Sequence, residues 1–144
     1  MCLSTVTETF EKDPLNEVDA WKVFVFYNSH KKKLLPPLFQ SVTIYPNVWI
    51  KDPNVEYDIA TRSGRSKYKG GFHSFLKKED AEAYEKSLFM NGDETTVLPI
   101  KCRGVTTKGT QDFVSFKKDE SSVVRSAESI VSREIFVLVT EELL

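Results

Sequence analysis

Tyr68-Lys-Gly-Gly-Phe-His-Ser-Phe75 runs into Lys78-Glu-Asp-Ala-Glu-Ala-Tyr84, and these two stretches decide the fold. Gly70 and Gly71 release the backbone from side-chain constraint, so they permit a positive φ angle or a close approach by another segment. A short strand of aromatic and small polar residues follows the glycines, and a helix begins soon after it. The predicted order is therefore a glycine turn, a strand and a helix.

The side chains of this predicted strand divide between its two faces. Because successive strand residues point to opposite sides, Phe72, Ser74 and Leu76 share one side. His73 and Phe75 share the other. The sequence thus gives one histidine a defined position directly after the glycine turn.

Two nearly unbroken apolar segments indicate strands at the centre of a sheet. They are Ala20–Tyr27 and Arg133–Thr140, and both are dense in β-branched and aromatic residues. A run without polar alternation is typical of a strand that is covered on both faces. We therefore expect Phe136, in the middle of the second segment, to be largely buried.

One helix is predicted, from about Lys78 to Met90. Ala81, Tyr84 and Leu88 recur at helical spacing and form a single apolar stripe, so Tyr84 should be largely buried. The rest of the chain is β-rich and lacks βαβ alternation. This pattern favours an α+β fold, in which a mixed or mostly antiparallel β-sheet carries the helix on one face.

The connecting segments suggest one domain that spans 1–144. Residues 1–19 are polar and lack periodicity, so they are predicted to form an irregular N-terminal arm. The segment 42–50 reads as a bent strand or as a hairpin around Pro46. The polar, basic and glycine-rich segment 61–71 is predicted to be a loop.

The second half of the chain is again predicted to be mostly extended. Pro99 places the strand 95–102 at a sheet edge or at a bulge, because proline has no backbone N–H to donate. Gly104 and Gly109 are typical of a connection to the next strand. The segment 123–130 fits either a short helix or an extended strand.

Composition and charge exclude several classes of protein. The chain is 40% hydrophobic and 12% aromatic, which is enough to bury a core without a metal or disulfide. A formal net charge of −1 argues against a general nucleic-acid binder. Cys2 and Cys102 are too far apart for a disulfide framework or a zinc ribbon. We expect no cofactor and no metal.

The same features predict a soluble protein of the cytoplasm. Two distant cysteines suit a reducing compartment. No apolar run approaches the roughly 20 residues that a membrane span needs. The polar and acidic start of the chain is unlike a signal peptide.

Five short elements occur in order along the chain: Met1-Cys-Leu, Trp21-Lys-Val, Gly71-Phe-His-Ser-Phe75 with Glu79-Asp-Ala81, Val97-Leu-Pro-Ile-Lys-Cys-Arg-Gly104 and Ala127-Glu-Ser-Ile130. Together they resemble small uncharacterised proteins of bacteriophages, prophages and gut bacteria. That family has no assigned activity. The resemblance implies a fold, a viral or mobile-element context, and a place in the host cytoplasm or virion, but it implies no chemistry.

The segment Thr61–Gly71 is the candidate ligand site. It has four cations and no acid, and its hydroxyls and glycine-rich backbone can donate hydrogen bonds to phosphate oxygens. Aromatic rings beside the cations can stack on a base. The candidate ligand-binding residues are Arg62, Arg65, Lys67, Tyr68, Lys69 and His73. The segment matches no phosphate-loop or dinucleotide fingerprint, and the alternative is a solvated loop without a ligand.

His73 allows two interpretations. It can serve as a general base, with a carboxylate such as Glu128 or Glu134 brought near by folding. The alternative, which we favour, is a structural ring that packs over the helix start and bonds a backbone carbonyl. No residue is assigned a catalytic role.

An apolar stretch with paired prolines follows the first central strand. It cannot pair regularly, so a protein partner or a second copy of the chain would cover it. Its predicted contact residues are Leu34, Leu35, Leu38 and Phe39. Burial under a neighbouring loop is the alternative.

Three functions follow from these features. The first is an accessory or interaction protein that acts by protein contact or assembly. The second is a protein that binds and sequesters a nucleotide or another phosphorylated ligand through residues 61–71. The third, with the least support, is a small enzyme that uses His73.

Overall fold

The computed structural model describes residues 3–10, 17–26, 34–35, 44–53, 55, 57–87, 95–116 and 121–139. Its strands are β1 Thr5–Thr9, β2 Val18–Phe26, β3 Leu34–Leu35, β4 Trp49–Lys51, β5 Asp58–Ala60, β6 Lys67–Lys69, β7 Phe72–Phe75, β8 Thr95–Phe116 and β9 Ser122–Val137. The helix is α1 Lys78–Ser87. Among the described residues no helix is long and apolar enough to cross a membrane.

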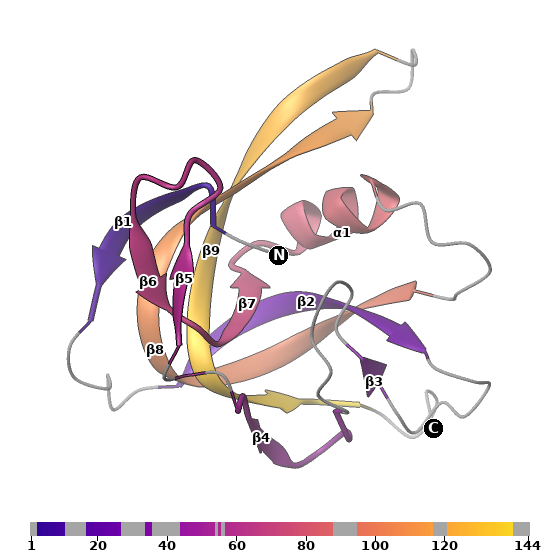
Figure 1. The fold of residues 1–144 in the computed structure, drawn as a ribbon. Helices are drawn as coiled ribbons and strands as arrows, with labels where there is room; N and C mark the ends of the chain where they lie inside the picture. Colours follow the sequence, from indigo (N-terminus) through magenta and orange to yellow (C-terminus); the bar gives the residue numbers. More distant parts are fainter. Residues whose placement is uncertain are drawn as a thin grey trace.

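The predicted α+β class is confirmed, and all the strand pairs found are antiparallel. The main sheet has the order β1-β8-β2-β7-β9-β4, with β3 on β2 and a further pairing of β8 with β9. Because β8 pairs with both β2 and β9, the strands β8, β2, β7 and β9 form a closed ring of pairings (Figure 1). Strands β5 and β6 form a separate two-stranded sheet.

The two long strands give the molecule its shape. β8 pairs with β9 from Ile100↔Val137 to Phe116↔Ser122, and a bulge interrupts the register between Val105 and Thr107. Gly104, with a φ angle of 68°, supplies the backbone conformation next to that bulge. The prediction that Gly104 and Gly109 mark a connection was therefore wrong, because β8 continues through both. The segment 123–130 is extended.

Three groups of buried side chains fill the fold. The largest lies inside the ring and includes Phe24, Phe72 and Cys102. The second lies between the sheet and α1 and includes Phe75 and Tyr84. The third group consists of Leu3, Tyr68 and Val131. Ile59 of the β5–β6 hairpin packs against it.

The predicted alternation along β7 is confirmed. Phe72 belongs to the interior group, Leu76 packs against it, and Phe75 belongs to the group under the helix. The glycine before the strand allows a close approach of chains. A Cβ atom on Gly71 would lie 2.5 Å from the carbonyl oxygen of Ser132, so a side chain there would push β7 away from β9.

The helix prediction is confirmed for the described part, since α1 begins at Lys78. Ala81 and Tyr84 are buried against the sheet, as the stripe predicts. Leu88 and Met90 lie outside the described residues. A pair not foreseen from the sequence fixes the helix start, because the Arg125 guanidinium of β9 bonds the Asp80 carboxylate at 2.8 Å.

Both apolar segments lie centrally, as predicted. β2 has β8 and β7 as neighbours, and the end of β9 lies between β8 and β4. Pro99 pairs only toward β2, because the pairing of β8 with β9 starts at Ile100. Within the described residues the strand therefore has an open edge at Pro99, one of the two predicted alternatives, although from Ile100 onward it lies between β2 and β9.

Three further expectations were wrong. Residues 1–19 are not an irregular arm, because the β-branched segment β1 pairs with β8 and β2 begins at Val18. Residues 61–71 are not all loop, because they contain β6. Phe136 is only partly buried: it turns to the outer side of β9, where its ring meets that of Trp49 at 5.6 Å between centroids.

Candidate functional site

The β5–β6 hairpin sorts the residues of the predicted ligand segment. β6 pairs with β5 from Asp58↔Lys69 to Ala60↔Lys67, and the chain turns between the two strands. Because strand side chains alternate, Tyr68 points inward and is buried, whereas Lys67 and Lys69 are exposed. The hairpin therefore presents two lysines on one side and an aromatic ring on the other.

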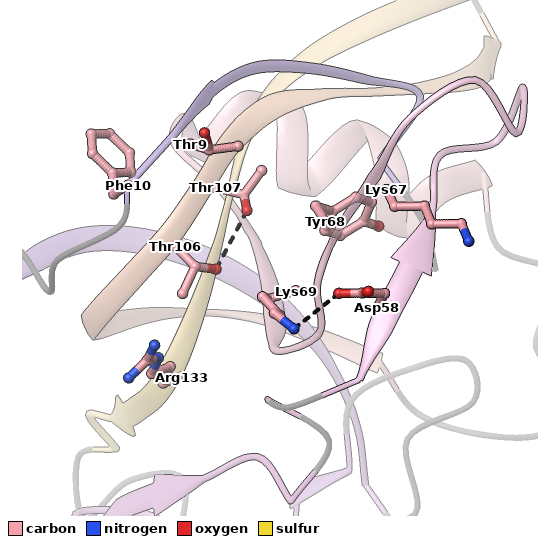
Figure 2. A pocket seen from close by; sticks show the side chains of 9 residues that line it. All are labelled: Thr9, Phe10, Asp58, Lys67, Tyr68, Lys69, Thr106, Thr107 and Arg133. Atoms are coloured by element: carbon pink, nitrogen blue, oxygen red, sulfur yellow. Dashed lines mark hydrogen bonds and ion pairs between the residues drawn. The ribbon is translucent and has the colours of Figure 1, made fainter.

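A cavity of about 390 Å³ lies where the hairpin faces the main sheet, and Figure 2 shows its lining. Four elements supply the side chains: the end of β1, the hairpin, the bulged part of β8, and β9. The volume is within the roughly 300–1,000 Å³ that is usual for small-molecule sites. The lining residues are Thr9, Phe10, Asp58, Lys67, Tyr68, Lys69, Thr106, Thr107 and Arg133.

The cavity is lined by three cations and one carboxylate. Lys69 turns toward Asp58, and its ammonium lies 3.1 Å from the carboxylate, whereas the Lys67 ammonium points away from the other lining residues (Figure 2). Arg133 enters from β9. Thr9 adds a hydroxyl at the end of β1, whereas the buried Thr107 hydroxyl donates to Thr106 at 3.4 Å and the Thr106 hydroxyl donates to the Val131 carbonyl at 3.5 Å. The arrangement can hold an anion whose oxygens accept several hydrogen bonds at once.

Arg62 and Arg65 lie outside this cavity. Arg62 borders a smaller depression with Ser4, Ser63 and Asp112, and its Nη1 donates to the Asp112 carbonyl at 3.0 Å. Arg65 is exposed in the turn and lines neither space. The fold thus brings Lys67 and Lys69 to one place and separates them from the two arginines.

Tyr68 and His73 form a buried hydrogen-bonded chain instead of a ligand-facing pair. His73 Nδ1–H donates a hydrogen bond to the Gly71 carbonyl at 3.2 Å. His73 Nε2 then accepts from the Tyr68 hydroxyl at 2.8 Å, and that hydroxyl accepts from Leu3 N–H at 2.8 Å. Every polar atom in this chain has a partner.

The hydrogen bonds among Leu3, Tyr68, His73 and Gly71 contradict two of the predicted ligand contacts. Tyr68 is 4% exposed and His73 is 3% exposed, so the tyrosine ring cannot stack on a base and the imidazole cannot reach a ligand. The expected carbonyl bond of His73 is confirmed. The ring also packs edge-on against that of Tyr68, at 5.6 Å between centroids.

The His73 environment does not support a general base. Burial, followed by the charge of Lys22, lowers the pKa of His73 to about 3. Glu134 is bound by Arg103 at 2.8 Å, a bond that lowers the pKa of its carboxyl. Glu128 is exposed. Neither carboxylate pairs with the imidazole, whose ring nitrogens are both used by the chain described above.

A buried polar cluster was missed from the sequence. Lys22 is 2% exposed inside the ring, and its ammonium donates to the His73 carbonyl. Burial lowers the pKa of Lys22 to about 8, although Cys102 and Asp52 act in the opposite direction. A single charge within an apolar strand was the signal, because such a side chain must either snorkel out or find partners inside.

Cys102 and two serines complete the interior cluster. The thiol lies 4.0 Å from the Ser74 hydroxyl, and burial raises the pKa of Cys102 to about 11. The prediction that Cys102 packs as a small apolar residue is confirmed, since it is fully buried in the main core. Ser132 lies close enough to lower that pKa, but its Oγ has no hydrogen bond of normal geometry.

The remaining candidate residues give no further site. Leu34 and Leu35 form β3 and pair with β2, but their side chains, like Leu38, Phe39 and Cys2, lie outside the described part of the chain. Within the described residues no three His, Cys, Asp or Glu side chains gather as a metal-binding group.

Comparison with protein-family models, with curated proteins and with solved structures finds no match to this chain. The resemblance to phage and prophage proteins stays a prediction. The functional argument therefore rests on the geometry of the cavity and on the surface of the fold.

Proposed function

We propose that the protein binds a small phosphate-bearing ligand in the cavity between the β5–β6 hairpin and the main sheet. One observation carries the proposal: Lys69, Arg133 and the Thr9 hydroxyl line one space of about 390 Å³. Ammonium, guanidinium and hydroxyl groups are the donors that phosphate oxygens accept from. Phe10 provides an apolar wall for the rest of the ligand.

Asp58 is the internal competitor for this ligand. The Asp58 carboxylate forms an ion pair with the Lys69 ammonium, and both side chains are more than half exposed. An exposed ion pair of this kind contributes little, so a phosphate with two or three charges can replace the carboxylate. The ligand therefore binds more tightly when Asp58 is neutralised.

Isothermal titration with inorganic phosphate, pyrophosphate and adenosine mono- and triphosphates tests the proposal at low salt. We expect Asp58→Asn to bind the best of these more tightly than the parent protein, and Lys69→Glu to bind it at least about tenfold more weakly. Arg65→Glu is the matched control, because it makes the same charge change on the same hairpin outside the cavity. Raising the salt should weaken binding to the parent protein.

Two outcomes contradict the proposal. One is that none of the four anions binds the parent protein or the Asp58→Asn variant. The other is that Arg65→Glu and Lys69→Glu weaken binding equally, since a general surface potential would then explain the effect.

Protein contact is a second candidate, and the projecting β8–β9 ribbon favours it. The ribbon extends beyond the rest of the fold (Figure 1) and carries exposed Val114, Val123 and Val124. Val114 and Val124 are cross-strand neighbours on one face of this projection, and an exposed apolar pair of this kind is typical of a contact surface. This second candidate includes an accessory role of phage type in a cytoplasm. Its support is the resemblance carried by the five short sequence elements, from Met1-Cys-Leu to Ala127-Glu-Ser-Ile130.

A further inference from the structure

The outer part of the β8–β9 ribbon has edges that no described strand covers. β7 pairs with β9 only at Ser129–Ser132, and Leu76 N–H extends that contact to the Glu128 carbonyl. The segment Ser122–Ala127 then continues as β9, and within the described residues it pairs with β8 alone. Its other side presents backbone N–H and C=O groups for pairing with a further strand.

The edge of β8 is shorter and partly occupied. β1 pairs with β8 at Thr107–Thr110. Beyond that point Ser4 accepts the Asp112 N–H, and Arg62 donates to the Asp112 carbonyl. The β9 edge is therefore the longer of the two that the described chain leaves open.

The β9 edge also lacks the usual protection against pairing. Natural edge strands carry exposed charges, prolines or bulges that block a second chain. In Ser122–Ala127 the only charged residue is Arg125, whose guanidinium is held on the helix side by Asp80. Val124 is 72% exposed on the opposite face of the ribbon, beside Val114 in the paired strand.

We propose that the β9 edge pairs antiparallel with the same edge of a second copy, on a two-fold axis at Val124. This inference rests on the second candidate function and is independent of the phosphate proposal. Centring on Val124 places Val124 opposite itself, Val123 opposite Arg125, and Ser122 opposite Ser126. Centring on Arg125 would oppose two like charges, which destabilises a strand pair. An isologous contact closes after two copies.

The expected dimer is weak, because a six-residue edge buries less surface than a standard interface. Sedimentation equilibrium of the full chain should show a monomer–dimer equilibrium whose dimer fraction rises with concentration. Val124→Lys places two ammonium groups together on the axis, so it should raise the dimer dissociation constant at least about tenfold. Val114→Lys, on the same face but off the edge, should change it less than about twofold.

Disulfide formation tests the register directly. Directly opposed residues of antiparallel strands have Cα atoms about 4.5–5.5 Å apart, which suits a disulfide. In a Cys2→Ser background, Val124→Cys should therefore cross-link under mild oxidation. Ser126→Cys should not, because each Ser126 faces Ser122. A mixture of Ser122→Cys and Ser126→Cys chains should form the mixed dimer.

Several results would overturn the proposal. The chain could stay monomeric at every concentration while Val124→Cys fails to cross-link. Ser126→Cys could cross-link as fast as Val124→Cys, which would exclude this register. Equal losses with Val114→Lys and Val124→Lys would assign the contact to the flat face of the ribbon. Far-ultraviolet circular dichroism of each variant verifies that it is folded.

Discussion

The two sides of the segment 61–75 differ more than its sequence suggests. On one side, Lys67 and Lys69 stand in solvent around a cavity, and Lys69 has a single exposed carboxylate partner. On the other, Tyr68 and His73 are buried in a chain of hydrogen bonds that leaves no polar atom unpaired. Neighbouring residues of one strand thus differ in burial and in hydrogen bonding, because strand geometry sends them to opposite faces.

The largest loss of stability in the segment 61–75 should come from replacing Phe72, which is fully buried in the interior. Phe72→Ala should lower the free energy of unfolding by about 3–5 kcal/mol, since it removes a large side chain and leaves a cavity. Phe136→Ala should cost less, because Phe136 is only partly buried. Chemical denaturation of both variants measures the difference, and equal losses would mean that the outer ring packs as tightly as the inner one.

The hydroxyl of Tyr68 gives the next largest effect. Tyr68→Phe keeps the ring but leaves the Leu3 N–H and His73 Nε2 without their partner. Unsatisfied buried groups cost about 1–3 kcal/mol. Tyr57→Phe, at a residue that is 67% exposed, is the control and should stay within about 0.5 kcal/mol. A Tyr68→Phe variant as stable as the control would show that this hydrogen-bonded chain contributes nothing.

Lowering the pH should destabilise the buried side through His73. Its pKa is about 3 in the folded chain and 6.5 when unfolded, so the unfolded chain binds more protons between these values. Stability is therefore present above about pH 6.5 and is lost as the pH falls toward 3, by about 2 kcal/mol between pH 7 and pH 5. Denaturation of the parent protein and of His73→Gln across this range isolates the histidine, because the variant should have a shallower slope. Identical slopes would contradict the assignment.

The smallest stability effect should come from the exposed side. Lys69→Met removes the ion pair with Asp58, which should cost less than about 1 kcal/mol because both groups are solvated. The same variant should still weaken binding of the phosphate ligand. Chemical denaturation and titration with the phosphate ligand should be measured on the same variant. A large loss of stability without a loss of binding would mean that Lys69 has a structural role and no binding role.

Local patterns were sufficient for much of the fold. Unbroken apolar runs predicted the central strands β2 and β9, and the stripe of Ala81 and Tyr84 predicted the packing of α1. The alternation along β7 placed Phe72 and Phe75 on opposite faces. These features depend on spacing along one segment, so the sequence alone determines them.

Tertiary structure decided the rest, because it depends on partners that are distant in the chain. β1 is a strand only because β8 offers an edge to it, and Gly104 lies within a strand because β9 holds both sides of the bulge. Lys22 stays buried because the ring closes around it. The candidate cavity joins the hairpin to Thr106, Thr107 and Arg133, which no local pattern connects to residues 61–71. The spacing of residues along one segment determines the direction in which a side chain points. The pairing of distant strands in the closed sheet determines which residues that side chain contacts.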